Sequence, residues 1–453
     1  MYLFSITYLG IFSLIISIFS FFNIIYSYYF NLYLNLNCYI YTLSISLFLG
    51  CIFIFTKKKN YKISIYYKIL TVLIGYFLLT FLISIPYYFS IYNLTFLDSY
   101  FEAISGFTST GFTIIENIKH LDQSLILWRS SSQWIGGLYF LSSIILLIDI
   151  FDTSLKKMLT NFLSFDTSET IKQSLKILII YTLLTFFIFV VLKLINLRTF
   201  DSFNLSMTLI SSGGFLPVNN LSNIINTNLK EIIFSLMMLS SFFSIFFIYN
   251  LIFFKKKNIL FIHEDIYLLI YFFVILILFF LILNHGNNFS VILLSLTSSI
   301  SNIGISLEKS PQNLSFVFLL LVIVGGSFFS TSSGIRFLKF YALFKFSINN
   351  LILHARPKNI FLNKYSVSGL NIEDSEIKKY FLSLIIFIIS LFILSSLLTI
   401  SDISLEKSFK LSILTLMNTV NSDMYGLDGF DFQGLSLFTK FYLILFMIIG
   451  RIE

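Results

Sequence analysis

The chain has 453 residues, of which 57% are hydrophobic and only 11% are charged. Soluble domains average about 25% charged residues, so this composition excludes an ordinary soluble protein. The formal net charge of +8 does not indicate nucleic-acid binding, because the lysines lie in short clusters between apolar runs rather than in one domain. Such clusters mark the cytoplasmic loops of membrane proteins. They occur at Lys57–Lys59, at Lys156 and Lys157, at Lys255–Lys257, and between Lys339 and Lys364.

Apolar runs of roughly 20 residues, the length that crosses the hydrocarbon core of a bilayer, recur along the whole chain. They predict an all-α, polytopic membrane protein in contact with membrane lipid. We expect about ten spanning helices, near residues 4–30, 38–56, 69–90, 128–150, 174–196, 231–254, 265–284, 313–345, 379–401 and 434–453. When the lysine clusters are placed in the cytoplasm, the connections after residues 90, 196, 284 and 401 all face outward.

These four outer connections share one unusual design. Each begins with an apolar stretch of about a dozen residues, too short to span a bilayer, and then reaches small polar residues. The stretches are DSYFEAISGFTSTGF, FDSFNLSMTLISSGGF, FSVILLSLTSSISNIGI and LEKSFKLSILTLMNTVNS, with Gly111, Gly213, Gly304 and Asn421 at or near their ends. Their spacing of about one hundred residues indicates a fourfold internal repeat with every loop on the same side of the membrane.

Two interpretations of the repeated loops are open. In the first, they are ordinary outer loops. In the second, they re-enter the membrane. Re-entrant loops would have to line a pore, because non-helical backbone at membrane depth is tolerated only where protein or water covers it. The fourfold recurrence favours re-entrant loops. A cation pore replaces the hydration shell of the ion with rings of oxygen atoms, and glycine permits the backbone angles that turn consecutive carbonyl groups inward.

Three of the loops supply the residue types that such a pore needs. They are Ser109-Thr110-Gly111, Ser211-Ser212-Gly213 and Asn302-Ile303-Gly304. The hydroxyl groups of Thr110 and Ser212 are further candidate ligands or anchors, and the short helices would direct their C-terminal carbonyl ends at a cation. Glu102, on the first short helix, either attracts cations to the pore mouth or orients the loop; the second role is favoured.

Several motifs resemble one known family. The stretches SGFTSTGFT, ISSGGF and WRSSSQWIGG (Trp128–Gly137) are similar to the Trk/Ktr/HKT superfamily of potassium transporters, and most similar to its bacterial Trk-type pore subunits. GGSFFSTSSGIRFLKF (Gly325–Phe340) and MIIGRIE (Met447–Glu453) agree with the same family, and the resemblance covers nearly the whole chain.

The resemblance implies a potassium uptake protein of the bacterial cytoplasmic membrane, driven by membrane potential and not an enzyme. It divides the chain into two N-terminal helices (1–60) and four units of helix, filter loop and helix (61–155, 156–258, 259–365 and 366–453). It places the potassium filter at the three glycine loops and at Thr419, Val420 and Asn421. It implies that an intramembrane gating loop at Ser327–Gly334 breaks the second helix of the third unit. The implied gate is made of Ser330, Thr331, Ser332, Ser333, Gly334 and Arg451.

The family also implies partners that the sequence does not itself specify. These are a second copy of the chain and a cytosolic nucleotide-binding regulatory subunit, for which the lysine-rich stretch Lys339–Arg356 is a candidate docking surface. No Walker A motif and no GxGxxG after a strand occurs, and the two cysteines and four histidines lack metal-binding spacing, so we expect no cofactor in this chain and potassium only as the transported ion.

This sequence departs from the family pattern in three places. The fourth loop lacks its glycine; Asn421 is the preferred equivalent, because asparagine tolerates left-handed backbone, and Asn421-Ser422-Asp423 is a competing alignment. Phe328 and Phe329 intrude into the gating loop, and the chain stops at Glu453, where the family's last helix continues.

Two other functions stay open at this point. The missing glycine favours a sodium-permeable or weakly selective cation transporter. A membrane enzyme acting on lipids would need ionisable residues clustered at one depth, which the sparse Asp, Glu and His residues do not obviously provide. Arg451 is either a pore-facing residue or an anchor at the inner membrane surface.

Overall fold

The computed structural model describes residues 3–55, 64–115, 117–147, 170–252, 263–283, 288–308, 310–355, 365–367, 370–372, 374–427 and 429–452. Six of its helices are long and apolar enough to cross a membrane. Their apolar spans are Ile6–Tyr29, Leu36–Phe55, Ile65–Tyr88, Gln173–Leu194, Glu264–Leu281 and Glu376–Ile400. Each coincides with a predicted span, so the chain is a polytopic helical membrane protein. The lysine clusters at 57–59, 156–157 and 255–257 lie outside the described residues.

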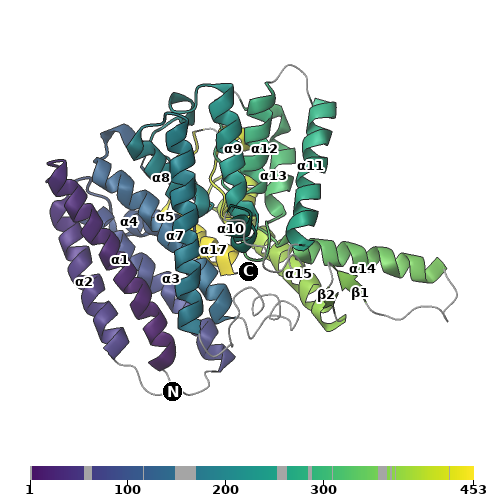
Figure 1. Ribbon diagram of the computed structural model, residues 1–453, viewed down its shortest axis with the longest axis horizontal. Coiled ribbons are helices and arrows are strands. Elements are labelled where there is room, and N and C mark those ends of the chain that lie inside the picture. The colour runs from purple at the N-terminus through teal and green to yellow at the C-terminus, as the bar shows by residue number, and fades with distance from the viewer. Residues whose placement is uncertain are drawn as a thin grey trace.

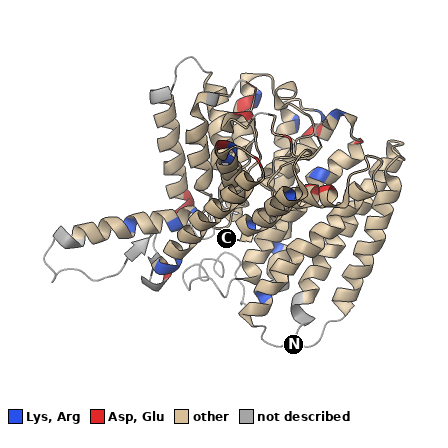
Figure 2. Cartoon of the chain, turned by 180° about the vertical axis from the view of Figure 1, so that it is seen from behind, with Lys and Arg blue, Asp and Glu red and all other residues tan. Residues whose placement is uncertain are grey.

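The chain begins with a helical hairpin, α1 (Leu3–Tyr29) and α2 (Leu36–Phe55), at one side of the molecule (Figure 1). Its helices pack along each other and against α3 (Ile65–Tyr88). Figure 2 shows the long helices almost free of charged side chains, as their insertion into hydrocarbon requires.

Four successive groups of helices follow the hairpin. Each contains a long helix and then a helix of 12 residues. The first group is α3, α4 (Phe96–Phe107) and α5 (Gln123–Leu146), and the second is α7 (Thr170–Leu194), α8 (Thr199–Ile210), α9 (Asn228–Phe242) and α10 (Ile245–Ile252). The third is α11 (His263–Leu283), α12 (Phe289–Ile300), α13 (Ser315–Ile323) and α14 (Phe337–Ala355), and the fourth is α15 (Asp374–Ile400), α16 (Leu405–Leu416) and α17 (Leu437–Ile452).

A small β-hairpin lies between the third and fourth groups. Strand β1 (Tyr365–Val367) pairs antiparallel with β2 (Leu370–Ile372). Figure 1 shows it beside α14, which runs away from the bundle and across the direction of α11.

Local sequence explains how the short helices begin. Thr95 caps α4, because its hydroxyl oxygen accepts a hydrogen bond from the Asp98 backbone N–H at 3.2 Å. Acidic residues occupy the first turns of three short helices, at Asp98, Asp201 and Glu406, where a negative charge complements the helix dipole. The C-terminal ends of these helices, which have the negative end of the helix dipole, lie inside the protein.

Helix α5 occupies the centre, and every residue from Ser124 to Leu146 is buried. Its glycines allow close packing on both sides. A Cβ at Gly136 would overlap the Phe107 carbonyl group at the end of α4, and a Cβ at Gly137 would lie 2.9 Å from the Cβ of Ser211 after α8. These contacts hold the ends of two short helices against one central helix.

Two of the predicted spans contain a break, and the second break lies at the intramembrane loop that the family resemblance implies for the third unit. The run 231–254 divides at Phe243, whose backbone is extended, into α9 and α10. The run 313–345 divides into α13 and α14, with irregular backbone between them. Both breaks are buried against each other: the Ile245 N–H donates to the Phe329 carbonyl at 3.1 Å, and the Ser327 N–H donates to the Phe242 carbonyl at 2.9 Å.

Candidate functional site

The four 12-residue helices end in the same backbone conformation. Two residues after each helix stands a residue with positive φ: Ser109 (60°), Ser212 (57°), Asn302 (58°) and Asn418 (46°). The next N–H donates to a carbonyl five residues earlier, from Thr110 to Ser105 (2.9 Å), Gly213 to Thr208 (2.8 Å), Ile303 to Ser298 (3.1 Å) and Thr419 to Leu414 (2.9 Å). This is the Schellman helix end, and it turns the chain sharply at four equivalent places.

The side chains at three of these positive-φ positions join one loop to the next. The pairs are Ser212 Oγ with the Ser301 carbonyl (2.8 Å), Asn302 Nδ2 with Thr419 Oγ1 (3.4 Å), and Asn418 Nδ2 with Thr110 Oγ1 (2.9 Å). They connect the second loop to the third, the third to the fourth, and the fourth to the first. The first and second loops also meet, because a Cβ added to Gly111 would lie 2.8 Å from the Gly214 Cα. The four loops, which lie far apart in sequence, therefore form a ring, and we call it the loop ring.

One backbone position from each loop lies at the centre of the loop ring. A Cβ added to Gly111 would lie 2.8 Å from the Gly214 Cα and 3.0 Å from the Val420 Cβ. A Cβ added to Gly304 would lie 2.5 Å from the Val420 carbonyl oxygen. Each position stands two residues after its positive-φ residue, so Gly111, Gly214, Gly304 and Val420 are equivalent.

This register corrects two predicted alignments. Gly213 and Asn421 were aligned with Gly111, and each is off by one residue. Gly213 lies against the Gln133 side chain instead. Asn421 follows the ring position and lines the cavity beside it. The sequence pattern does not reveal where each short helix ends, and that end sets the register.

The backbone carbonyl groups of the loop ring are free to bind a ligand. Within the described residues no hydrogen bond reaches the carbonyl oxygens of Thr110, Gly111, Gly213, Gly214, Ile303, Gly304, Thr419 and Val420. Buried carbonyl groups without a partner are rare, because their desolvation costs free energy. A desolvated cation is the kind of ligand that eight such oxygens suit.

A cavity of about 240 Å³ opens beside the loop ring. Gly111, Gly214 and Val420 lie at its ring side, and Asn219, Asn220, Glu308, Asn421 and Asp423 are among its polar lining residues. Their oxygen atoms make this cavity favourable for a hydrated cation next to the dehydrated site.

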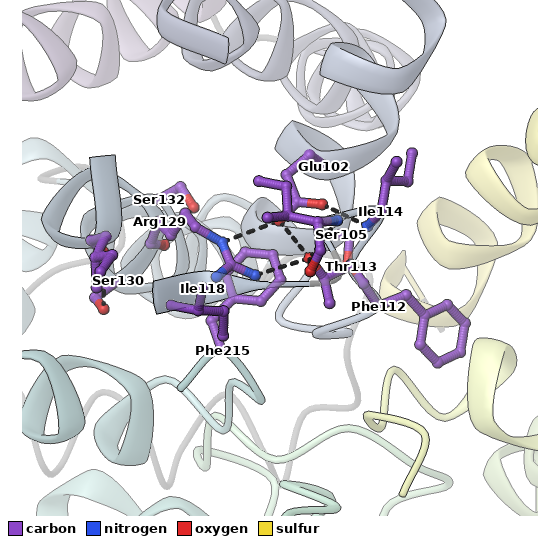
Figure 3. Close-up of polar contacts among 12 residues, drawn as sticks. Glu102, Ser105, Phe112, Thr113, Ile114, Ile118, Arg129, Ser130, Ser132 and Phe215 are labelled. Carbon is purple, nitrogen blue, oxygen red and sulfur yellow. Dashed lines mark hydrogen bonds and ion pairs between the residues drawn. The ribbon is translucent and has the colours of Figure 1, made fainter. Parts of the chain in front are cut away.

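A buried ion pair supports the first loop from behind (Figure 3). Arg129 Nε lies 3.0 Å from Glu102 Oε1, and the two side chains are 1% and 0% exposed. Glu102 Oε2 accepts the Ile114 N–H at 3.0 Å, and Glu102 Oε1 accepts the Thr113 hydroxyl at 3.0 Å. Glu102 therefore orients the loop. The Arg129 guanidinium lies over the Phe215 ring at 4.2 Å, which links the first loop to the second.

Sequence analysis did not identify Arg129 or Gln133. An arginine in an otherwise apolar span was the available signal, since such charges are costly unless paired. Gln133 supports the second loop as Glu102 supports the first. In the amide orientation that satisfies both ends of its side chain, the Gln133 oxygen accepts the Gly214 N–H at 3.1 Å and the Phe215 N–H at 3.0 Å.

We expect Arg129→Ala to destabilise the protein strongly, because Glu102 would keep a buried charge without its cation. Breaking a buried pair from one side costs about 3–5 kcal/mol. Thermal unfolding in detergent measures the effect. The double variant Glu102→Gln, Arg129→Met removes both charges and should recover part of the loss. Equal melting temperatures for Arg129→Ala and the parent protein would show that the pair is not structural.

The break between α13 and α14 places a buried loop, residues 324–336, against the loop ring. Thr331 Oγ1 donates to the Ile210 carbonyl at 2.7 Å, at the end of α8. Ser332 Oγ donates to Asn302 Oδ1 at 3.3 Å. Ser330 and Ser333 are at most 4% exposed, and Gly334 has a φ of +82°. The structure thus brings the predicted gate residues together and into contact with the second and third ring loops.

Two charged residues that sequence analysis missed hold this loop in place. Arg336 Nη1 donates to the carbonyl oxygens of Ser327 and Ser332, both at 3.0 Å. Glu264 Oε1 accepts the Phe328 N–H at 3.0 Å, and its Oε2 accepts the Ser327 hydroxyl at 3.2 Å. Both are charges within or at the edge of apolar runs, which was the signal available.

Arg451 lies buried next to the same loop. Its side chain is 1% exposed, its Nη1 donates to Ser333 Oγ, and its guanidinium lies 4.2 Å from the centre of the Phe140 ring. Its Nε and Nη2 have no hydrogen-bond partner among the described residues. An intramembrane arginine without a carboxylate partner is costly unless it faces water or a ligand.

The geometry agrees with similarities to known proteins. No protein-family model matches the chain. It is 26% identical over 395 residues to an uncharacterized cation transporter of Methanocaldococcus jannaschii, covering 85% of this chain and 79% of that protein. It is 24% identical over 390 residues to the Trk system potassium uptake protein TrkG of Escherichia coli, covering 80% and 77% of the two chains.

The fold is also similar to that of a protein whose structure has been solved. The crystal structure of the potassium transporter TrkH from Vibrio parahaemolyticus superposes with a TM-score of 0.81 at 19% identity, covering 98% of this chain and 96% of that one. The chain is therefore similar in sequence to Trk system potassium uptake proteins and has the fold of a potassium transporter of that kind.

Proposed function

We propose that the protein takes up potassium through a central pore whose selectivity filter is the loop ring. The observation that carries this proposal is the convergence of Gly111, Gly214, Gly304 and Val420, with eight unpaired carbonyl oxygens at and next to these positions. The Trk relatives are named for potassium uptake, and such names favour transport over the enzymatic alternative.

The filter comprises the predicted residues with the corrected register. Its oxygen ligands come from Ser109, Thr110 and Gly111, from Ser212, Gly213 and Gly214, from Asn302, Ile303 and Gly304, and from Asn418, Thr419 and Val420. A potassium ion loses its hydration shell in the 240 Å³ cavity and exchanges it for these oxygens. The C-terminal ends of α4, α8, α12 and α16 direct the negative ends of their dipoles toward the ion.

Membrane potential supplies the driving force for uptake. One elementary charge crossing 100 mV gains about 2.3 kcal/mol, and about 1.4 kcal/mol corresponds to a tenfold concentration ratio. The loop of residues 324–336 and Arg451 form the gate beside the filter. Their contacts with Ile210, Asn302 and Ser333 support this assignment.

The division into two N-terminal helices and four pore units is part of the proposal, as is a location in the bacterial cytoplasmic membrane. We further propose a homodimer and a cytosolic nucleotide-binding regulatory subunit. Helix α14, which extends from the bundle and carries Lys339 and Lys345, is the candidate docking surface (Figure 1). Arg356, at the end of the predicted surface, lies outside the described residues.

Flux measurements on purified protein in proteoliposomes test the proposal. We expect potassium uptake driven by an inside-negative potential, with sodium uptake much slower. Equal uptake of both ions would support the weakly selective alternative. Protein that stays folded and transports neither ion, with or without a cytosolic extract, would contradict the proposal.

One observation favours the weakly selective alternative. Val420 occupies the ring position that is glycine in the other three loops, and its Cβ lies where a Cβ of Gly214 would point. A branched side chain there narrows the ring on one side, so fewer oxygens can surround a potassium ion at equal distance.

We therefore expect Val420→Gly to increase both potassium uptake and the ratio of potassium to sodium uptake. The same proteoliposome assay, run with each cation, measures both quantities. Val218→Gly is a matched control, because Val218 lines the adjacent cavity but is not a ring position. A ratio that rises equally in both variants would remove the special role of Val420.

A further inference from the structure

A large apolar groove lies apart from the loop ring, between the N-terminal hairpin and the first two pore units. Its volume is about 810 Å³. Helices α1, α5, α7 and α8 form its walls, and the lining includes Phe19, Trp134 and Phe186. None of the proposed filter or gate residues line it.

The position of the groove determines which medium fills it. Its walls α1 and α7 are membrane spans, and the groove is lined by α1 residues from Ile15 to Tyr29, nearly all in its C-terminal half, and by Phe30 just after it. That half faces the outer leaflet when the lysine clusters are cytoplasmic. Lining residues Phe22 and Phe186 are 56% and 64% exposed, so the groove opens sideways toward the bilayer.

We propose that this groove binds one acyl chain of an outer-leaflet glycerolipid. The polar side chains in its wall are mostly satisfied internally: Trp134 Nε1 donates to Thr185 Oγ1 at 3.0 Å, and the Ser206 hydroxyl donates to the Phe203 carbonyl at 2.8 Å. The wall therefore presents hydrocarbon to its occupant, and a hydrocarbon chain fills such a space without leaving a polar group unpaired.

One unpaired polar atom lies toward the membrane surface. Asn23 is 1% exposed, and its Oδ1 has no hydrogen-bond partner among the described residues. Asn23 stands six residues before the end of α1 at Tyr29, or about 9 Å below it at 1.5 Å per residue. The groove is lined by Asn23, Tyr26 and Tyr29 toward the end of α1, and by Ile15 and Ile18 toward the middle of that helix. Its more polar end thus lies toward the membrane surface, as in a lipid.

The acyl chain would support the ion pathway. Ser206 and Met207, which line the groove, belong to α8, and α8 ends in the second loop of the loop ring. An occupant that fills the groove packs against the back of this short helix and limits its displacement.

The tryptophans of the chain provide a direct test. The chain has two, and only Trp134 lines the groove; Trp128 is fully buried and donates to the Ile83 carbonyl at 3.1 Å. The protein is reconstituted in phosphatidylcholine vesicles whose acyl chains are brominated near their middle, and tryptophan emission is measured. We expect the Trp128→Phe variant to lose most of its emission. In wild-type protein, only the part of the emission that comes from Trp134 should be quenched. This second measurement keeps the test usable if the Trp128→Phe variant does not fold.

Groove occupancy is separated from general lipid contact by two neighbouring variants of α7. Thr182 lines the groove, whereas Leu183 faces the bilayer outside it. Thr182→Phe, which fills part of the groove, should restore most of the Trp134 emission, and Leu183→Phe should not. No quenching of Trp134, as expected if a second copy of the chain covers the groove, would overturn the proposal. Equal quenching in the two variants would also overturn it.

Discussion

Gly111→Ala should abolish most potassium uptake while the protein remains folded. Gly111 has a φ of +83°, where a side chain costs roughly 1–2 kcal/mol. The added methyl group would also lie 2.8 Å from the Gly214 Cα and 3.0 Å from the Val420 Cβ, at the centre of the loop ring. One of these backbones must move, and its carbonyl oxygens move with it. We expect uptake to fall at least about tenfold, the change that 1.4 kcal/mol produces.

A matched control separates crowding at the ring from backbone strain. Gly429 has a φ of +58°, and a Cβ added there would meet nothing within 4 Å. Gly429→Ala therefore introduces the same kind of strain without the collision, and its potassium flux in proteoliposomes should resemble that of the parent protein. Normal uptake by Gly111→Ala would exclude Gly111 from the filter.

Arg451→Gln should increase potassium uptake severalfold. The Arg451 guanidinium is buried beside the gating loop and forms no ion pair with a described residue. A passing potassium ion is repelled by it; two unit charges 4 Å apart repel by about 4 kcal/mol at an effective dielectric constant of 20. Loss of the bond to Ser333 Oγ also frees the loop, so both effects act in the same direction.

Arg451→Lys is the control, because it keeps the positive charge in nearly the same volume. Its uptake should stay close to that of the parent protein in rubidium flux measurements. If Arg451→Gln folds normally and its uptake is unchanged or lower, Arg451 is a structural brace of α17 and not part of the gate.

The proposed filter and the proposed gate are connected through one side chain. Asn302 Nδ2 bonds to the Val322 carbonyl at 2.7 Å and lies 3.4 Å from Thr419 Oγ1, and Asn302 Oδ1 accepts the Ser332 hydroxyl. Asn302 thus contacts the neighbouring ring loop, the end of α13 and the gating loop. A displacement of the gating loop (residues 324–336) must therefore either break the hydrogen bond between Ser332 and Asn302 or move Asn302, which also contacts Thr419 in the loop ring.

Much of the fold was predictable because the bilayer imposes simple requirements. A span must be long and apolar, so α1, α2, α3, α7, α11 and α15 were evident from composition and length. The break after Phe242 was not evident, since the apolar run continues through it, and the break after Ile323 was expected only from the family resemblance. They form because residues far along the chain, such as Asp265 and Phe329, accept the freed N–H groups of Ser244 and Ile245.

The candidate site was predictable as a set of loops but not as a geometry. Repetition in the sequence located the four loops and most residues of the loop ring, because small polar residues and glycines suit close approach of backbone. The register of Gly214 and Val420 required the observed helix ends. Likewise, Glu102 meets Arg129 and Ser333 meets Arg451 only through tertiary packing, over 27 and 118 residues of chain.

The sequence by itself determined the membrane class, the spanning lengths and the fourfold loop pattern, since these depend on composition and on local spacing. Only the tertiary structure decided which polar groups pair, which carbonyl oxygens stay unpaired, and which residue stands at each ring position. The physical reason is the low dielectric constant of the membrane interior: each buried polar group must find a partner, and that partner lies on another helix.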